Sequence, residues 1–216
     1  MNYNEITSNE EVLALIKKAN ANLKALKFTD HSEAHTKLVA ERAAFILKQL
    51  NYSEHDVELA RIAGFMHDIG NAVNRTHHAE YGALLANDIL KQTDMSVQDR
   101  LIVMSAISHH DESTGGAIDA ISAALIIADK TDVRRNRVKV FPSSGLDIHN
   151  RVNYAVTSNH ITVDDDLITL HLEVDESICT MYEYFDIFLG RMMMSRQAAE
   201  MLNTKFSLIV NENRIL

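Results

Sequence analysis

The sequence predicts a mainly α-helical protein, a helical bundle followed by a small C-terminal α+β unit. With one proline and seven glycines in 216 residues, the chain has few helix breakers. Apolar residues recur at helical spacing through the first 130 residues, whereas segments 159–163 and 167–174 alternate in the manner of strands. We therefore expect residues 1–140 to form a helical domain and residues 146–216 to form the C-terminal unit.

Start signals and apolar stripes place the expected helices of the first part. The expected helices are residues 9–27, a helix that starts near residue 30, and residues 54–68, 78–91, 96–110 and 117–128. Asp30 and Glu33 have the spacing of a capping box with the aspartate as N-cap. Gly70 is expected to end the helix before it by adopting a left-handed conformation.

The C-terminal unit should contain a short helix, a β-hairpin, a long helix and a closing strand. The expected ranges are 146–157 for the first helix, 167–174 for the second hairpin strand, 176–202 for the long helix and 206–210 for the last strand. Residues 141–145 form the clearest linker. Three roles stay open for this unit: a surface for homodimerisation, a lid, or a partner-binding module.

The composition excludes several classes of protein. A net charge of −9 and a pI near 5.6 argue against extended binding to nucleic acid or to an anionic membrane surface. No apolar run approaches the roughly 18 residues that span a bilayer. A single cysteine, Cys179, cannot form an internal disulfide, so we expect a cytoplasmic protein.

The adjacent residues His67 and Asp68 are the centre of the functional prediction. They lie among apolar residues, and a buried carboxylate is costly unless a cation or hydrogen bonds compensate its charge. Asp129 closes an apolar helix and raises the same requirement, while His35 belongs to an inward-facing stripe. This pattern indicates a metal site.

The candidate ligands suffice for two divalent ions, which imidazole and carboxylate groups suit well. They are His35, His67, Asp68, His78, His109, His110 and Asp129. Two ions about 3.5 to 4 Å apart could hold a hydroxide nucleophile and neutralise a phosphoryl transition state. Asp68 is the candidate to bridge them, because a carboxylate has two oxygens. His31 could reach a third ion, but the capping box already explains its segment.

These residues resemble the HD-domain superfamily of metal-dependent phosphohydrolases in order and spacing. His35 resembles the first ligand, the run from His67 to Gly70 the defining doublet, and Asp129 the last ligand. The segment from His78 to Gly82 is similar to one found in HD-GYP phosphodiesterases and in bacterial HD hydrolases of diadenosine tetraphosphate. The Gly-Tyr-Pro motif is absent, and Asn71 stands where many relatives have lysine.

The resemblance implies an HD-like bundle with two ions held by His35, His67, Asp68, His78, His110 and Asp129, and with His109 as a further candidate. Iron or manganese would be the usual metal, and magnesium, nickel, cobalt or zinc also suit such a site. The implied activity is hydrolysis of a phosphoester or phosphoanhydride in a nucleotide-like small molecule by a metal-bound hydroxide, with Asp68 and His67 in the catalytic centre.

A basic cluster follows the last candidate ligand. It comprises Lys130, Arg134, Arg135, Arg137 and Lys139. The first three are candidates for binding the substrate phosphate, although cations are also favourable at any helix C-terminus. Two other functions remain open: a di-iron oxygenase of the same superfamily, and a non-catalytic regulator that responds to nucleotides.

Overall fold

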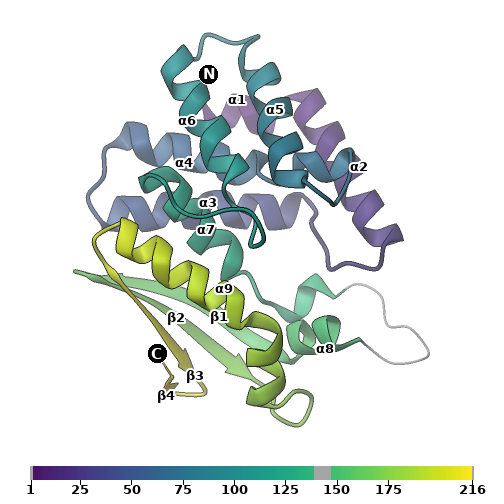
Figure 1. Cartoon of the computed structure of the whole chain (residues 1–216), viewed down its shortest axis with the longest axis vertical. Coiled ribbons are helices and arrows are strands. Elements are labelled where there is room, and N and C mark those ends of the chain that lie inside the picture. Colours follow the sequence, from purple (N-terminus) through teal and green to yellow (C-terminus); the bar gives the residue numbers. More distant parts are fainter. Residues whose placement is uncertain (1, 139–146, 216) are drawn as a thin grey trace.

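The computed structural model, which describes residues 2–138 and 147–215, has a helical body with a smaller sheet-containing unit on one side (Figure 1). The helices of the body are α1 (Tyr3–Thr7), α2 (Glu10–Ala25), α3 (Glu33–Gln49), α4 (Glu54–Met66), α5 (His78–Leu90), α6 (Val97–Ser108) and α7 (Ala120–Lys130). Two short 3-10 helices, η1 (Ile69–Ala72) and η2 (Arg135–Arg137), follow α4 and α7. The prediction of a mainly α-helical bundle is confirmed, and α1 was not foreseen.

Side-chain caps fix where most of these helices begin. Ser53 and Ser96 accept hydrogen bonds from the backbone N–H groups of Asp56 and Asp99 at the starts of α4 and α6. The expected cap at Asp30 was wrong, because Ser32 occupies the N-cap position of α3. Asp30 instead accepts hydrogen bonds from Ser32 Oγ and Asn20 Nδ2.

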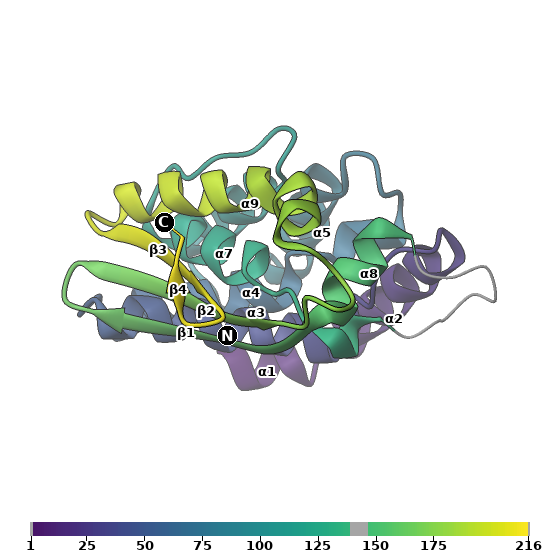
Figure 2. The same ribbon diagram turned by 90° about the horizontal axis from the view of Figure 1, so that it is seen from below.

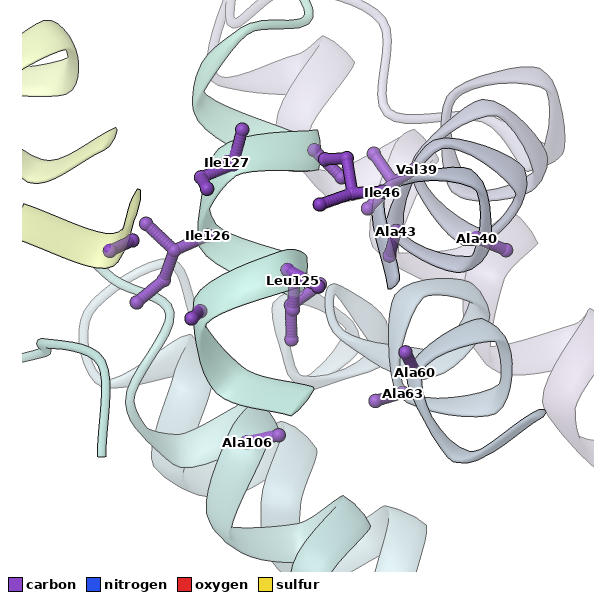
Figure 3. Packing of buried hydrophobic residues seen from close by; sticks show 14 of the residues in the cluster. Val39, Ala40, Ala43, Ile46, Ala60, Ala63, Ala106, Leu125, Ile126 and Ile127 are labelled. Atoms are coloured by element: carbon purple, nitrogen blue, oxygen red, sulfur yellow. The ribbon is translucent and has the colours of Figure 1, made fainter. Parts of the chain in front are cut away.

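Helix α7 lies at the centre of the hydrophobic core. Its residues from Ile121 to Ala128 are all buried. Figure 3 shows Leu125 on the side of α7 that faces α3 and α4, while Ile126 points toward the C-terminal segment drawn in yellow. Because α7 is covered from both sides, the carboxylate of Asp129 near its end is mostly buried, with 14% of the side chain exposed.

The C-terminal unit combines two helices with one sheet. Its elements are α8 (Ile148–Ala155), β1 (Val156–Asp164), β2 (Leu167–Val174), α9 (Met181–Met201), β3 (Lys205–Val210) and β4 (Asn213–Arg214). In the described part of the chain the strand order is β1-β2-β3-β4. β1 and β2 form an antiparallel hairpin, and α9 connects β2 to the parallel strand β3. The predicted helix, hairpin, helix and strand are therefore present, and β4 is additional.

Polar contacts join this unit to the helical body. Arg42 on α3 donates to Thr131 Oγ1 at 3.0 Å and to Asn159 Oδ1 on β1 at 2.7 Å. Asn159 Nδ2 donates to the carbonyls of Thr131 and Val133. Helix α9 packs along α7, and Figure 2 shows α9 on one side of the sheet. The unit thus lies beside the end of α7, where Asp129 is found.

The proposed linker at residues 141–145 and the cation Lys139 lie outside the described residues. Within the described ranges, none of the helices has both the length and the apolar character that a membrane crossing requires.

Candidate metal centre

The pair His67 and Asp68 lies where α4 changes into η1. Helix α4 ends at Met66, His67 is its C-cap, and Asp68 has φ −98° and ψ 1°. This change of backbone direction lets two adjacent side chains face the same region, which a continuous helix would not allow. Gly70 is not left-handed as expected. A Cβ at residue 70 would lie 2.0 Å from the carbonyl oxygen of His78, so glycine is required because η1 and α5 are in close contact.

Five imidazoles surround the Asp68 carboxylate in two groups. On the side of Oδ2 lie the Nε2 atoms of His67 at 3.3 Å, His35 at 3.6 Å and His31 at 4.0 Å. On the side of Oδ1 lie the Nε2 atoms of His78 at 3.7 Å and His110 at 4.0 Å. Each oxygen of one carboxylate therefore faces its own set of nitrogen donors.

The second nitrogen of every ring is already engaged. Each Nδ1 atom lies between 2.6 and 3.1 Å from an oxygen: Thr29 O for His31, Asp132 Oδ2 for His35, Gly64 O for His67, Arg75 O for His78 and Ile107 O for His110. Since these oxygens accept hydrogen bonds, Nδ1 carries a proton and Nε2 is the ring atom available to an ion near Asp68. In most metal-binding histidines an oxygen acceptor fixes the ring in this way, through the nitrogen that does not bind the ion.

Asp129 completes the group on the Oδ2 side. Its Oδ1 lies 3.4 Å from His35 Nε2 and 3.7 Å from His67 Nε2. Ligand atoms about 2.1 Å from one ion stand roughly 3.0 to 3.4 Å apart in octahedral or tetrahedral geometry. The donor atoms of His35, His67 and Asp129 approach these separations, whereas those of His67, Asp68 and His110 are more widely spaced, all within 4.8 Å of one another.

An unpaired acceptor beside Asp68 also fits a bound ion. Asn71 Nδ2 donates to Asp68 Oδ1 at 2.9 Å and so orients the carboxylate. Asn71 Oδ1 is buried and has no hydrogen-bond partner among the described residues. A buried amide oxygen of this kind is normally satisfied, and a water ligand on an ion at Asp68 would satisfy it. The residues present therefore fit divalent metal ions.

Burial and charge give these groups unequal proton affinities. Burial lowers the pKa of His110 to about 3 and the pKa of His31 well below its usual value. Burial and Arg137 also act to lower the pKa of His35, but hydrogen bonds to three carboxylates outweigh them and raise it to about 9. Burial would raise the pKa of Asp68, yet its histidine neighbours hold it well below its usual value. The centre therefore presents an ionised carboxylate among mostly neutral imidazoles.

The comparison with protein families covers this region. Residues 33–136 match the family model described as the HD domain. This part of the chain is an HD domain. It extends from the start of α3 into η2, so four of the five rings and both carboxylates lie inside it. HD domains bind divalent metal ions, and the family fold is that of metal-dependent phosphohydrolases.

Two other proteins are similar to this chain. The uncharacterized protein MJ1020 of Methanocaldococcus jannaschii is 29% identical over 163 residues, which are 65% of this chain and 62% of that protein. The present chain thus spans less than two thirds of that relative. A crystal structure of a predicted HD superfamily hydrolase from an uncultured Thermotogales bacterium has 25% identity and a TM-score of 0.46, covering 62% of this chain and 75% of that one.

A cleft of about 640 Å³ opens beside the HD-domain centre. His31 and His78 line its inner end, and α8 and α9 of the C-terminal unit contribute to its outer wall. Its cationic lining residues are Lys27, Arg75 and Arg191. A cleft of this size is in the range of small-molecule sites.

The structure places the candidate ligands unequally. His35, His67, Asp68, His78, His110 and Asp129 converge as described. His109 does not join them: its Nδ1 lies 2.9 Å from Ser105 O and 2.9 Å from Ser108 Oγ, and in the described part of the chain it makes no ion pair with Asp68. His109 and His110 are adjacent at the end of α6, where one ring turns inward and the other outward.

The three candidate phosphate-binding cations have other partners. Lys130 Nζ lies 2.7 Å from Asp129 Oδ2, Arg134 pairs with Asp132, and Arg135 donates to the carbonyl of Tyr154. None of the three is among the residues that line the described cleft.

Two functional candidates were not foreseen. Asp132 is fully buried and orients His35, and Arg75 lies in the cleft with Nη1 3.2 Å from His78 Nε2. Asp132 could have been suspected, because it follows Asp129 by three residues, but Arg75 lies in a loop without any pattern.

Proposed function

We propose that this protein is a metal-dependent phosphohydrolase with two ions, which cleaves a phosphoester or phosphoanhydride of a nucleotide-like small molecule. The observation that supports two ions is the position of Asp68, whose Oδ2 faces one set of imidazoles and whose Oδ1 faces another. A carboxylate in this position can bridge two ions. When bound, such ions activate water at neutral pH and neutralise the charge that develops on a phosphoryl group.

The side chains around the centre would hold the ligands in place during the reaction. Asp132 and the backbone carbonyls fix the imidazole orientations through Nδ1, and Asn71 fixes the carboxylate of Asp68. Preorganised ligands of this kind keep their geometry while charge moves during the reaction. Asp68 and His67 are fully enclosed by the core, so the substrate must approach from the cleft at His31 and His78.

Arg75 is the best candidate to bind the phosphate of the substrate. Its guanidinium lies beside His78 at the inner end of the cleft, and its plane stands over the ring of Phe28 at 5.4 Å. An arginine held by an aromatic face presents several N–H donors to phosphate oxygens in a fixed geometry. The cleft position supports Arg75 more strongly than Lys130, whose ammonium group already pairs with Asp129.

The nucleotide-like substrate is supported by the size and lining of the cleft. Its volume of about 640 Å³ far exceeds the space a phosphate group needs. The wall beyond Arg75 carries Phe28 together with the polar side chains of His149 and Asn150. An aromatic surface and hydrogen-bonding side chains suit the base and sugar of a nucleotide.

The test is metal-reconstituted turnover. Protein stripped with a chelator is loaded with manganese or iron, and phosphate release is measured over a panel of nucleotides and dinucleotides. We expect release from at least one of them, loss of turnover in Asp68→Ala, and unchanged turnover in His55→Ala, whose ring is exposed and pairs with Asp99.

Oxygen consumption is recorded in the same samples. Stoichiometric oxygen uptake by the iron-loaded protein without phosphate release would replace the hydrolase with the oxygenase. Tight binding of an unmodified nucleotide without either reaction would replace it with the regulator.

A further inference from the structure

His31 lies in a segment that the helix start does not explain. Helix α3 begins at Glu33 with Ser32 as N-cap, so His31 precedes the helix and has no capping role. Its backbone N–H donates to Asn20 Oδ1 at 3.0 Å, which ties this segment to α2. The segment is thereby held in one position, and the imidazole of His31 is directed inward.

The ring of His31 is more exposed than the other four rings, but it is oriented in the same way. Its Nδ1 lies 2.7 Å from Thr29 O, which leaves Nε2 as the free donor. This Nε2 is 4.0 Å from Asp68 Oδ2, the same separation as between His110 and Asp68 Oδ1. The ring centroid lies 5.3 Å from that of His35 in an edge-on contact, close to the 5.2 Å between His35 and His67.

We propose that His31 is a fifth protein ligand of the ion on the Oδ2 side of Asp68, so that the two ions have unequal coordination. This inference rests on the two-ion centre of the proposed function. Ligands on opposite sides of one ion stand about 4.2 Å apart when each bond is about 2.1 Å. The 4.0 Å between His31 Nε2 and Asp68 Oδ2 is within this limit, as are the shorter separations of His35 and His67 from Asp68, so one ion could contact all of these residues.

The unequal ligand sets assign different tasks to the two sides. The Oδ2 side has five protein ligands: His31, His35, His67, Asp68 and Asp129. The Oδ1 side has His78, His110 and Asp68. His31 and His78 both line the cleft, but Arg75 lies on the side of His78, with Nη1 3.2 Å from His78 Nε2. An ion with few protein ligands keeps positions for water and substrate, as catalytic metal sites do. The substrate phosphate therefore binds on the Oδ1 side, and the ion on the Oδ2 side is held more tightly.

The experiment measures metal release without any substrate. Manganese-loaded protein is titrated with a chelator, and bound metal is counted by elemental analysis. We expect two ions that leave the wild-type protein in separate steps. In His31→Ala the tighter step should weaken by about tenfold or more, the effect expected when metal-site geometry is lost.

Three further variants provide the controls. His77→Ala removes a neighbouring exposed histidine of the cleft and should leave both steps unchanged. His110→Ala should abolish the weaker step and leave the tighter one. His31→Gln, which retains a polar side chain, should weaken the tighter step as His31→Ala does. Circular dichroism of each metal-free variant shows whether it has folded.

Two results would overturn the inference. Three ions in the wild-type protein and two in His31→Ala would make His31 the ligand of a separate ion. Unchanged release steps in a folded His31 variant would make it a cleft residue only. Metal release does not depend on turnover, so two unequal steps without phosphate release would refute the proposed function and leave this inference intact.

Discussion

The contact between η1 and α5 can be tested by the substitution Gly70→Ala. The added Cβ would lie 2.0 Å from the carbonyl oxygen of His78 and 2.4 Å from the backbone nitrogen of Gly82. Both atoms belong to the backbone of α5, so no side chain can rotate to make room. Overpacking in a core usually costs about 1–3 kcal/mol, and we expect the upper end of that range or more here.

Gly116→Ala is the matched control, because a Cβ there meets no atom within 4 Å. Alanine also stabilises both variants by about 0.4–1 kcal/mol, because it lowers the conformational entropy of the unfolded chain. The difference in unfolding free energy between the two variants therefore isolates the clash. The free energy of unfolding is measured by urea titration of the metal-free proteins. Because the clash displaces His78, Gly70→Ala should also weaken the metal site on the Oδ1 side. Equal stability of the two variants, within about 0.5 kcal/mol, would refute the reasoning.

Three further predictions concern the groups around the centre. Asp132→Asn should destabilise the protein by about 3–5 kcal/mol in urea titrations, because it leaves buried cations without their carboxylate, whereas the exposed Asp166→Asn should have little effect. Asn71→Ala should lower metal affinity about 10- to 100-fold in chelator titrations, and unchanged affinity would remove its role in orienting Asp68. The free energy of unfolding of the metal-free protein should be highest near pH 6.5. Below pH 6.5 it falls, because His110 takes up a proton in the unfolded chain but has a pKa of about 3 in the folded protein. Above pH 6.5 it falls, because the stabilisation from protonated His35 is lost as the pH rises through its folded pKa of about 9. A stability curve that stays flat from pH 6.5 to 9 would contradict the raised pKa of His35.

Local signals predicted much of the fold, and long-range contacts explain the failures. Ser53 and Ser96 begin helices because their own side chains cap the adjacent backbone, which a sequence pattern shows directly. Asp30 has the same pattern but accepts its hydrogen bonds from Asn20 and Ser32 instead. The parallel pairing of β2 with β3 also depends on residues far apart in the chain, and alternation within each strand cannot reveal it.

Helix periodicity predicted the inward position of two candidate ligands. His35 lies on the inward stripe of α3, and His78 begins α5 with its ring toward the core. His110 was favoured over His109 as a ligand, and the structure places the His110 ring near Asp68, whereas His109 contacts Ser105 and Ser108. Arg75 escaped prediction because its position depends on Phe28, which lies in another loop.

The contacts between the C-terminal unit and the HD domain determine which parts of the protein unfold together. Arg42 and Asn159 tie α3 to β1, and Ile126 on the other side of α7 faces the C-terminal segment (Figure 3). Loss of the C-terminal unit, whose helix α9 packs along α7, would expose one side of α7, near whose end Asp129 lies. We therefore expect the slowest-exchanging amides of α7 and β2 to exchange with deuterium at the same rate, as members of one cooperative unit.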